Sequence, residues 1–151
     1  MLFGGSGENQ FFDDVWTYDL HTNVWSKMHT IGDAPSARSR HCSLIWKGFL
    51  VVYGGSDAKA FDPCLYLLDL NIKRWHKIAA GRETFVPQAR RDHGAAVIKD
   101  SFYVFGGKVS PTQYADAALL RFNLALVNPK VGDNRGKKKG GGGRGEISHI
   151  F

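Results

Sequence analysis

Short runs of apolar and aromatic residues, not long amphipathic stretches, form the hydrophobic pattern of this chain. Four such runs follow one another in its middle, at residues 41–46, 49–53, 65–69 and 74–78. Lys47-Gly48 links the first two, and a two-residue link between β-prone runs predicts a hairpin. Asn71-Ile72-Lys73 forms the turn between the last two. The pattern therefore predicts four short strands per unit and an all-β fold, because no helical period appears.

The same pattern occurs more than once along the chain. A double glycine follows an apolar run at three places, spaced by 50 and 52 residues: Gly4-Gly5, Gly54-Gly55 and Gly106-Gly107. Trp25 and Trp75 each lie 20 residues after the second glycine of a pair, and Asp19 and Asp69 each lie 14 residues after it. Several landmarks in one order at one spacing predict an internal repeat of about fifty residues.

A short similar segment opens the second and third copies. The sequences PSAR and PQAR end at Arg38 and Arg90, each 16 residues before the next double glycine. His41 and His93 follow three residues after these arginines. These segments, named the lead-in segments below, add a further landmark to the repeat.

Together these landmarks resemble those of the kelch repeat, the four-stranded blade of a β-propeller. The resemblance rests on the double glycine closing the second strand, the Tyr18-Asp19-Leu20 type of third strand and the tryptophan of the fourth. It implies kelch-type β-propeller blades in three units followed by a tail. These are a partial repeat at residues 1–34, a complete repeat at 35–86, a degenerate repeat at 87–131 and the tail at 132–151.

The blade count indicates an incomplete propeller. We expect about two, four and three strands in the three copies, or about 2.5–3 four-stranded antiparallel blades, whereas propellers close with roughly four to eight. We therefore expect a piece of a propeller; missing blades supplied by another chain are the less economical alternative.

The third copy departs from the pattern before the chain ends. Leu119–Leu124 aligns with the third strand of the first copy after two extra residues, and the tryptophan position then falls at Pro129. Proline can neither fill the space between blades nor donate a strand hydrogen bond. Residues 132–151 have no period, and we expect them to form a disordered, basic, glycine-rich tail.

The repeated residues have structural interpretations. Paired glycines permit backbone angles forbidden to other residues and a close approach of neighbouring chain. Trp25 and Trp75 are expected to pack between successive blades. For His41 and His93 we expect a hydrogen bond near the start of each first strand, because buried polar groups are normally paired.

Arg38 and Arg90 are candidate partner-binding residues. In kelch propellers, arginines at this position often lie at the mouth of the central channel, and in some members they contact acidic peptides. Guanidinium groups bind carboxylates through paired hydrogen bonds. Arg40 and Arg91 add positive charge nearby. A structural alternative stays open for Arg38 and Arg90, namely that they hold loop carbonyls between blades.

The segments after the double glycines differ in length and sequence, at residues 6–13, 56–63 and 108–114. Loops that vary on a repeated scaffold often carry specificity. Phe61 and Tyr114 are candidate contact residues in these loops, with Phe11 and Phe12 beside them. Packing of these aromatic rings against the blades is the alternative.

Enzyme chemistry finds little support in the sequence. The six histidines show no ligand spacing, Cys42 and Cys64 form no CxxC motif, and no nucleotide-binding or nucleophile motif appears. We therefore expect no metal, cofactor or catalytic residue. A fragment of a propeller-based metal oxidoreductase is the alternative.

Charge and cysteine content add weaker indications. The formal net charge is +6, and the tail alone holds five basic and two acidic residues. A glycine-spaced basic tract can attract RNA, but incidental solvated tails of this kind are more common. Two cysteines fit a reduced cytoplasmic or nuclear protein, and no apolar stretch is long enough for a membrane span. The sequence thus favours a non-catalytic scaffold or adaptor that binds a protein partner, with an acidic peptide segment as the expected ligand.

Overall fold

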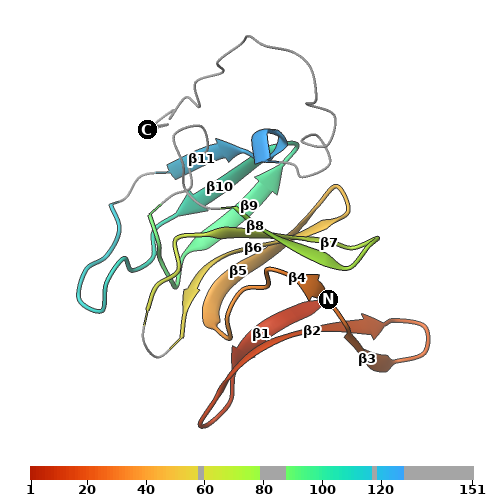
Figure 1. Ribbon diagram of the computed structural model, residues 1–151. Coiled ribbons are helices and arrows are strands. Elements are labelled where there is room, and N and C mark those ends of the chain that lie inside the picture. The colour runs from red at the N-terminus through yellow and green to blue at the C-terminus, as the bar shows by residue number, and fades with distance from the viewer. Residues whose placement is uncertain (58–59, 79–87, 117–118, 128–151) are drawn as a thin grey trace.

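The computed structural model describes residues 1–57, 60–78, 88–116 and 119–127, and these form three β-sheets (Figure 1). The first sheet contains β1 (Leu2–Ser6), β2 (Phe11–Asp19) and β3 (Val24–Met28) in that order. The second contains β4 (Ile31–Gly32), β5 (Ser39–Trp46), β6 (Phe49–Ser56), β7 (Leu65–Asp69) and β8 (Arg74–Ile78). The third contains β9 (Gly94–Ile98), β10 (Ser101–Phe105) and β11 (Leu119–Asn123), followed by the 3-10 turn η1 (Leu124–Val127).

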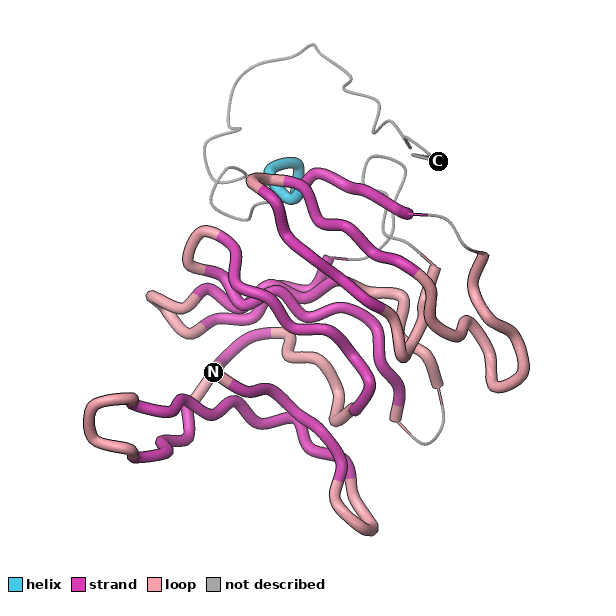
Figure 2. The backbone as a smooth tube through the Cα atoms, turned by 180° about the vertical axis from the view of Figure 1, so that it is seen from behind, coloured by secondary structure: helices cyan, strands magenta, loops and turns pink. Residues whose placement is uncertain are grey.

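The sheets are successive copies of one unit, named blades 1, 2 and 3. They lie side by side in chain order, as the ribbon and the view from behind both show (Figures 1 and 2). Neighbouring strands within the blades pair antiparallel, with one exception: β4 joins β8 in parallel at the edge of blade 2. The expected all-β, kelch-type architecture is confirmed, and the described blades do not form a closed ring.

Blade 2 matches the strands predicted from its hydrophobic runs. In the β5–β6 hairpin Trp46 pairs with Phe49, and both turn residues have positive φ, +43° at Lys47 and +82° at Gly48. Two positive φ values are typical of the type I′ turn that suits strand twist. The predicted turn at residues 71–73 joins β7 to β8.

Blade 1 has three described strands where about two were expected. The short run before the first double glycine is a full partner strand, because Leu2 pairs with Trp16 and Phe3 with Val15. The third copy has three described strands, as expected. Pro129 and the tail at 132–151 lie outside the described residues.

The core consists of two layers, one at each junction between blades. Between blades 1 and 2, Phe3 and Val15 are buried with one face of β6 and β7, including Val52 and Leu68. Between blades 2 and 3, the opposite face of the same strands is buried with the apolar face of β10. All eight residues of β6 are buried, because this strand has a neighbouring blade on each side.

The two repeated tryptophans differ in environment. Trp75 is 2% exposed, and its ring centroid lies 5.4 Å from that of Phe3 in blade 1. Its indole N–H donates to the Thr30 hydroxyl at 3.2 Å. Trp25 is 52% exposed and contacts Tyr18 of its own blade. The interblade packing expected of Trp25 is therefore absent, because no described blade covers that face of blade 1.

The paired glycines of blade 2 permit close packing, Gly54 against blade 3 and Gly55 against β5 of its own blade. Gly54 and Gly55 have φ of +70° and +80°. A Cβ at Gly54 would clash with the Arg90 carbonyl oxygen, and one at Gly55 would lie 2.6 Å from the Ser39 carbonyl oxygen. Glycine is needed at these positions for both its backbone angle and its lack of a side chain.

Candidate functional site

Arg38 occupies the interior of blade 2, not its surface. Its side chain is 1% exposed, and its guanidinium donates to the carbonyl oxygens of Ser36 and Gly54 at 2.9 and 3.1 Å. It also forms an ion pair with Asp62, with Nη2 2.7 Å from Oδ2. The guanidinium lies over the ring of Tyr66 at 5.2 Å. These contacts leave no exposed donor surface for a partner.

Arg90 has the equivalent arrangement in blade 3. It is buried, and it donates to the carbonyl oxygens of Gln88 and Gly106 at 3.2 and 2.9 Å. The repeated arginines thus hold carbonyl oxygens, which is the structural alternative that the sequence left open. Because both side chains are buried and occupied, we withdraw Arg38 and Arg90 as candidate peptide-binding residues.

The lead-in segments also join neighbouring blades through the backbone. The carbonyl oxygen of Arg38 accepts from the Gly5 N–H at 2.8 Å, and that of Arg90 accepts from the Gly55 N–H at 2.9 Å. Each arginine therefore bonds its own blade through its side chain and the preceding blade through its main chain.

Asp62 is an ionised partner that the sequence gave no means of finding. Its carboxylate accepts hydrogen bonds from Arg38, from the Tyr66 hydroxyl at 2.6 Å and from the Cys64 N–H at 2.7 Å. Burial alone would raise the pKa of Asp62, but these bonds outweigh it and lower the pKa to about 2. The carboxylate therefore stays charged at any ordinary pH.

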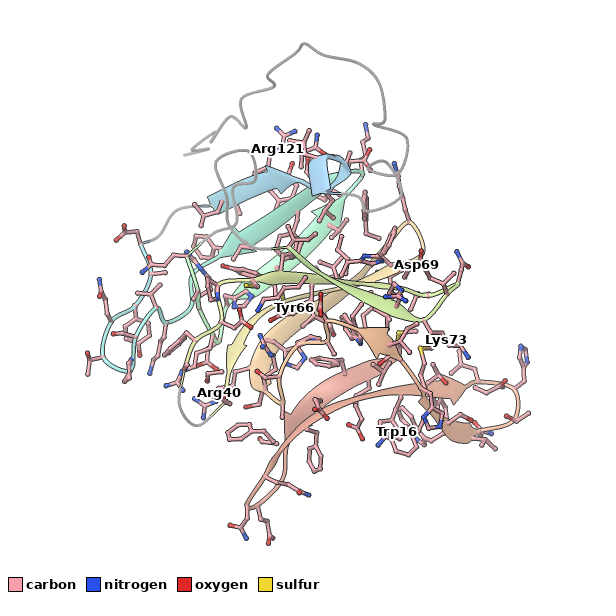
Figure 3. The ribbon with its side chains drawn as sticks, viewed as in Figure 1. Trp16, Arg40, Tyr66, Asp69, Lys73 and Arg121 are labelled. Carbon is pink, nitrogen blue, oxygen red and sulfur yellow. The ribbon has the colours of Figure 1, made fainter. Side chains whose placement is uncertain are left out.

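Of the four predicted arginines, Arg40 and Arg91 keep exposed side-chain surface, 54% at Arg40 and 22% at Arg91, where the Nε is buried without a hydrogen-bond partner. Both guanidinium groups lie 3.7 Å from the Asp92 carboxylate, a long ion-pair distance. Arg91 also lies over the Phe61 ring at 5.1 Å, and its Nη1 reaches the Ser56 hydroxyl at 3.5 Å. Three of the predicted contact residues, Arg40, Arg91 and Phe61, are thus brought together at one end of the blades. Figure 3 marks this end by Arg40.

Tyr114 lies at the same end but in a separate loop of blade 3. It is exposed, and its ring lies 5.0 Å from the Lys108 ammonium. Lys108 exchanges both backbone hydrogen bonds with Arg91, at 2.8 and 3.0 Å. Tyr114 therefore adjoins the arginine pair through Lys108.

A pocket of about 440 Å³ opens between blade 1 and this arginine pair. Its lining combines the β1–β2 loop with Arg40, Arg91 and the start of the β6–β7 loop, namely Ser6–Phe11, Ser39, Ser56 and Asp57. A second pocket of about 410 Å³ lies beside it, lined by Arg38, Phe61, Asp62 and Lys77 among others. Sequence reasoning missed the acidic residues near the arginine pair, namely Glu8 and Asp57 in the lining of the first pocket and Asp92 beside the two guanidinium groups, since single carboxylates show no pattern.

The repeated histidines pack at the junctions. The rings of His41 and His93 meet the aromatic residue of the preceding blade edge-on, Phe3 at 5.2 Å and Tyr53 at 5.3 Å. His93 Nε2 lies 3.2 Å from the Cys42 sulfur. Burial raises the pKa of the Cys42 thiol to about 12, so this thiol is not activated as a nucleophile. Both Nδ1 atoms are buried without a hydrogen-bond partner.

These histidines make stability depend on pH. Burial, then the charge of Arg90, then His41 lower the pKa of His93 from 6.5 to about 4, against a small opposing effect of Asp92. Burial and Arg38 also lower the pKa of His41, opposed by a backbone hydrogen bond with Phe3. Below pH 6.5 the unfolded chain binds protons that the folded chain does not, so stability falls as the pH drops toward 4.

We expect the free energy of unfolding to fall by about 2 kcal/mol between pH 7 and pH 4.5, measured by urea titration. His93→Gln should remove most of this slope, while exposed His21→Gln should leave it unchanged. The Asp62 effect lies at lower pH, between 3.8 and about 2. An equal slope in the His93→Gln protein would contradict this assignment.

Within residues 1–57, 60–78, 88–116 and 119–127, no three histidine, cysteine or acidic side chains gather in a way that could hold a metal ion. The same ranges contain no helix with the length and apolar character needed to cross a membrane.

Comparison with known proteins decides the family. A family model described as the KLHDC2/KLHL20/DRC7 Kelch-repeats domain matches residues 1–128. The chain belongs to the Kelch-repeat family. Kelch-repeat proteins are generally non-catalytic interaction modules.

The Kelch-repeat relatives are much longer than this chain. Multiple epidermal growth factor-like domains protein 8 of Rattus norvegicus is 31% identical over 133 residues, which is 82% of this chain and 4% of the relative. Kelch domain-containing protein 1 of Homo sapiens is 33% identical over 100 residues, which is 63% of this chain and 24% of the relative. The solved structure of YjhT matches with a TM-score of 0.66 at 19% identity, covering 82% of this chain and 46% of that one. This last likeness shows the Kelch-type propeller fold.

Proposed function

We propose that this chain is a non-catalytic protein-interaction module that binds an acidic segment of a protein partner at the Arg40–Arg91 pair. The observation that carries the proposal is the state of these two side chains. Of the four predicted arginines, they are the two whose side chains do not donate to carbonyl oxygens in the described structure, and their contact with Asp92 is long, at 3.7 Å. A partner carboxylate can therefore displace a weak ion pair and form shorter, charge-assisted hydrogen bonds.

The surroundings support a peptide as the ligand. The adjoining pocket is lined largely by loop residues, which suits an extended segment more than a small apolar molecule. The Phe61 ring packs against the Arg91 guanidinium. A guanidinium that is already positioned in this way loses less conformational freedom when a partner binds. Exposed Tyr114 adds an amphipathic ring of the kind enriched at interfaces.

The acidic residues of the pocket narrow the choice of segment. Glu8 and Asp57 line the same pocket as the two arginines. A run of carboxylates would be repelled by Glu8 and Asp57. One or two carboxylates directed at Arg40 and Arg91 would avoid this repulsion. We therefore propose a partner segment of mixed polarity with acidic residues at defined positions. The two free cysteines support a cytoplasmic or nuclear setting.

Binding to a fluorescently labelled peptide array tests the proposal. The array holds ten-residue peptides with one, two or no Glu residues, each matched by a Glu→Gln peptide, and binding is read at low and physiological salt. Glu-containing peptides should bind more tightly than their Gln counterparts, with the difference shrinking as salt rises. Arg40→Gln with Arg91→Gln should reduce the affinity at least tenfold.

Lys73→Gln is the matched control. It removes one positive charge, as each of the two arginine substitutions does, from an exposed turn on the opposite side of the blades (Figure 3). Its affinity should equal that of the unaltered chain. Equal loss in the Lys73 variant, or no preference for Glu over Gln peptides, would overturn the assignment of this site.

A further inference from the structure

The two exposed arginines of the candidate site converge on a single carboxylate oxygen. Arg40 Nη1 and Arg91 Nε each lie 3.7 Å from Oδ2 of Asp92. Arg40 belongs to blade 2, whereas Arg91 and Asp92 belong to the segment that leads into blade 3. The Asp92 side chain is 42% exposed. An anion of the chain itself therefore already occupies the position between the two guanidinium groups.

Asp92 fills this position without completing the hydrogen bonds of the arginines. Hydrogen bonds between N–H and O span 2.7–3.2 Å, and both contacts are longer. The same kinds of group come to 2.7 Å in the Arg38–Asp62 pair. Arg91 Nε is buried and has no hydrogen-bond partner, although buried donors are normally paired. The site thus has room for an acceptor that lies closer than Asp92 does.

Backbone contacts explain why Asp92 stays at this distance. Its N–H donates to the Arg40 carbonyl oxygen at 3.1 Å, and its φ is +56°. Arg91 is fixed by the two backbone hydrogen bonds that it exchanges with Lys108. With the main chain of both residues held in place, the carboxylate cannot approach both guanidinium groups through a shift of its backbone.

The repeat sets the position of Asp92 apart from its neighbours. Arg40 and Asp92 are repeat counterparts, because each lies two residues after a lead-in arginine, and their φ values are +61° and +56°. The lead-in arginines themselves and the histidines that follow are the same in both copies. Strained backbone of this kind in residues other than glycine is concentrated at functional sites. The change from a cation to an anion at one repeat position therefore points to a role in binding.

We propose that Asp92 is an internal competitor of the ligand, so that an acidic residue of the partner must displace its carboxylate from Arg40 and Arg91. This inference rests on the proposed peptide site and adds the residue that regulates its affinity. Exposed ion pairs contribute little, so Asp92 leaves at small cost. A ligand carboxylate that bonds both guanidinium groups gains more than Asp92 loses, whereas one that reaches a single guanidinium does not. Asp92 thereby selects segments that present an acidic residue to both arginines.

The variant Asp92→Asn tests the competition with the Glu-containing peptides of the array. Asparagine keeps the size of the side chain and tolerates positive φ as aspartate does, so the backbone contact with Arg40 is preserved. Without the competing charge, the affinity for a Glu peptide should rise about three- to fivefold, as expected when an exposed ion pair is released. Fluorescence anisotropy measures the affinity, and near-UV circular dichroism verifies that the variant keeps its fold.

Glu8→Gln is the matched control for the charge of the pocket. Glu8 lines the same pocket, but the carboxylate beside the two guanidinium groups is that of Asp92. The control removes one negative charge without releasing either arginine. Its gain in affinity should stay below about twofold at physiological salt, where exposed charges that are not in contact are largely screened. Equal gains in Glu8→Gln and Asp92→Asn would overturn the proposal.

A double-mutant cycle connects the gain to the arginines. Arg40→Gln should reduce the affinity by a larger factor in the Asp92→Asn chain than in the native chain, because Arg40 has no competing contact there. Equal factors in the two chains, or no gain in Asp92→Asn, overturn the competition and leave the peptide site in place. If both chains bind Glu and Gln peptides equally, the peptide site falls and the competition falls with it.

Discussion

Replacing Arg38 with alanine is expected to lower the free energy of unfolding by roughly 3 kcal/mol, even though arginine is ordinarily a surface residue. The change removes the hydrogen bonds to the Ser36 and Gly54 carbonyl oxygens and leaves the Asp62 carboxylate without its cation. Buried polar groups that lose a partner cost their full desolvation. Urea or thermal unfolding of the purified chain measures the effect.

Further variants separate the contribution of packing to this loss of stability from the contribution of the polar contacts. Arg40→Ala makes the same chemical change two residues away on an exposed side chain, and it should cost less than about 0.5 kcal/mol. Arg38→Met keeps much of the buried volume, so a loss that persists there belongs to the polar contacts. Adding Asp62→Asn to Arg38→Met should then recover part of the loss. Full stability in Arg38→Ala would show that the buried guanidinium does not support the blade.

The second large effect is expected for Gly54→Ala, which should cost about 3 kcal/mol or more. Positive φ alone costs an ordinary residue roughly 1–2 kcal/mol, and the added methyl group would also clash with the Arg90 carbonyl oxygen and approach His93 Cε1 at 2.6 Å. Overpacking of this kind typically adds 1–3 kcal/mol.

Gly106 is a matched control for the cost of overpacking. It is the repeat counterpart of Gly54, its φ of +67° is nearly the same, and a Cβ there would meet nothing within 4 Å. The stability loss of Gly106→Ala should therefore contain only the cost of the backbone angle. If both variants lose the same stability, the contact between blades 2 and 3 is not what makes Gly54 necessary.

The strands of this fold were predictable because they depend on local pattern. Apolar runs, two-residue turns and spaced glycines predict the positions of β5 to β8 without knowledge of any neighbour, although β5 begins two residues before its predicted run and β6 ends three residues after its own. The two-residue strand β4 was not predictable. Ile31–Gly32 pairs in parallel with Arg74 and Trp75, and nothing in its own sequence indicates a strand.

The candidate site was only partly predictable, because burial depends on which blade lies beside a residue. Trp25 and Trp75 occupy the same repeat position, yet one is exposed and the other is core. Arg38 and Arg40 are two residues apart, yet one is enclosed and the other projects outward. The Asp62 partner of Arg38 lies 24 residues away in a variable loop, so sequence alone could not pair them.

The double role of the lead-in arginines accounts for which parts of the chain can change in length during evolution. Because the side chain of Arg38 bonds the Gly54 carbonyl oxygen while its own carbonyl oxygen bonds Gly5, the 16 residues up to Gly54 connect two fixed points. Arg90 and Gly106 repeat the same span. An insertion within β5 or β6 would shift the strand register and break a bond to one blade or the other, whereas an insertion in the loops after the double glycines leaves both bonds in place. New binding specificity can therefore arise by insertion in these loops, provided that Asp62 keeps its ion pair with Arg38.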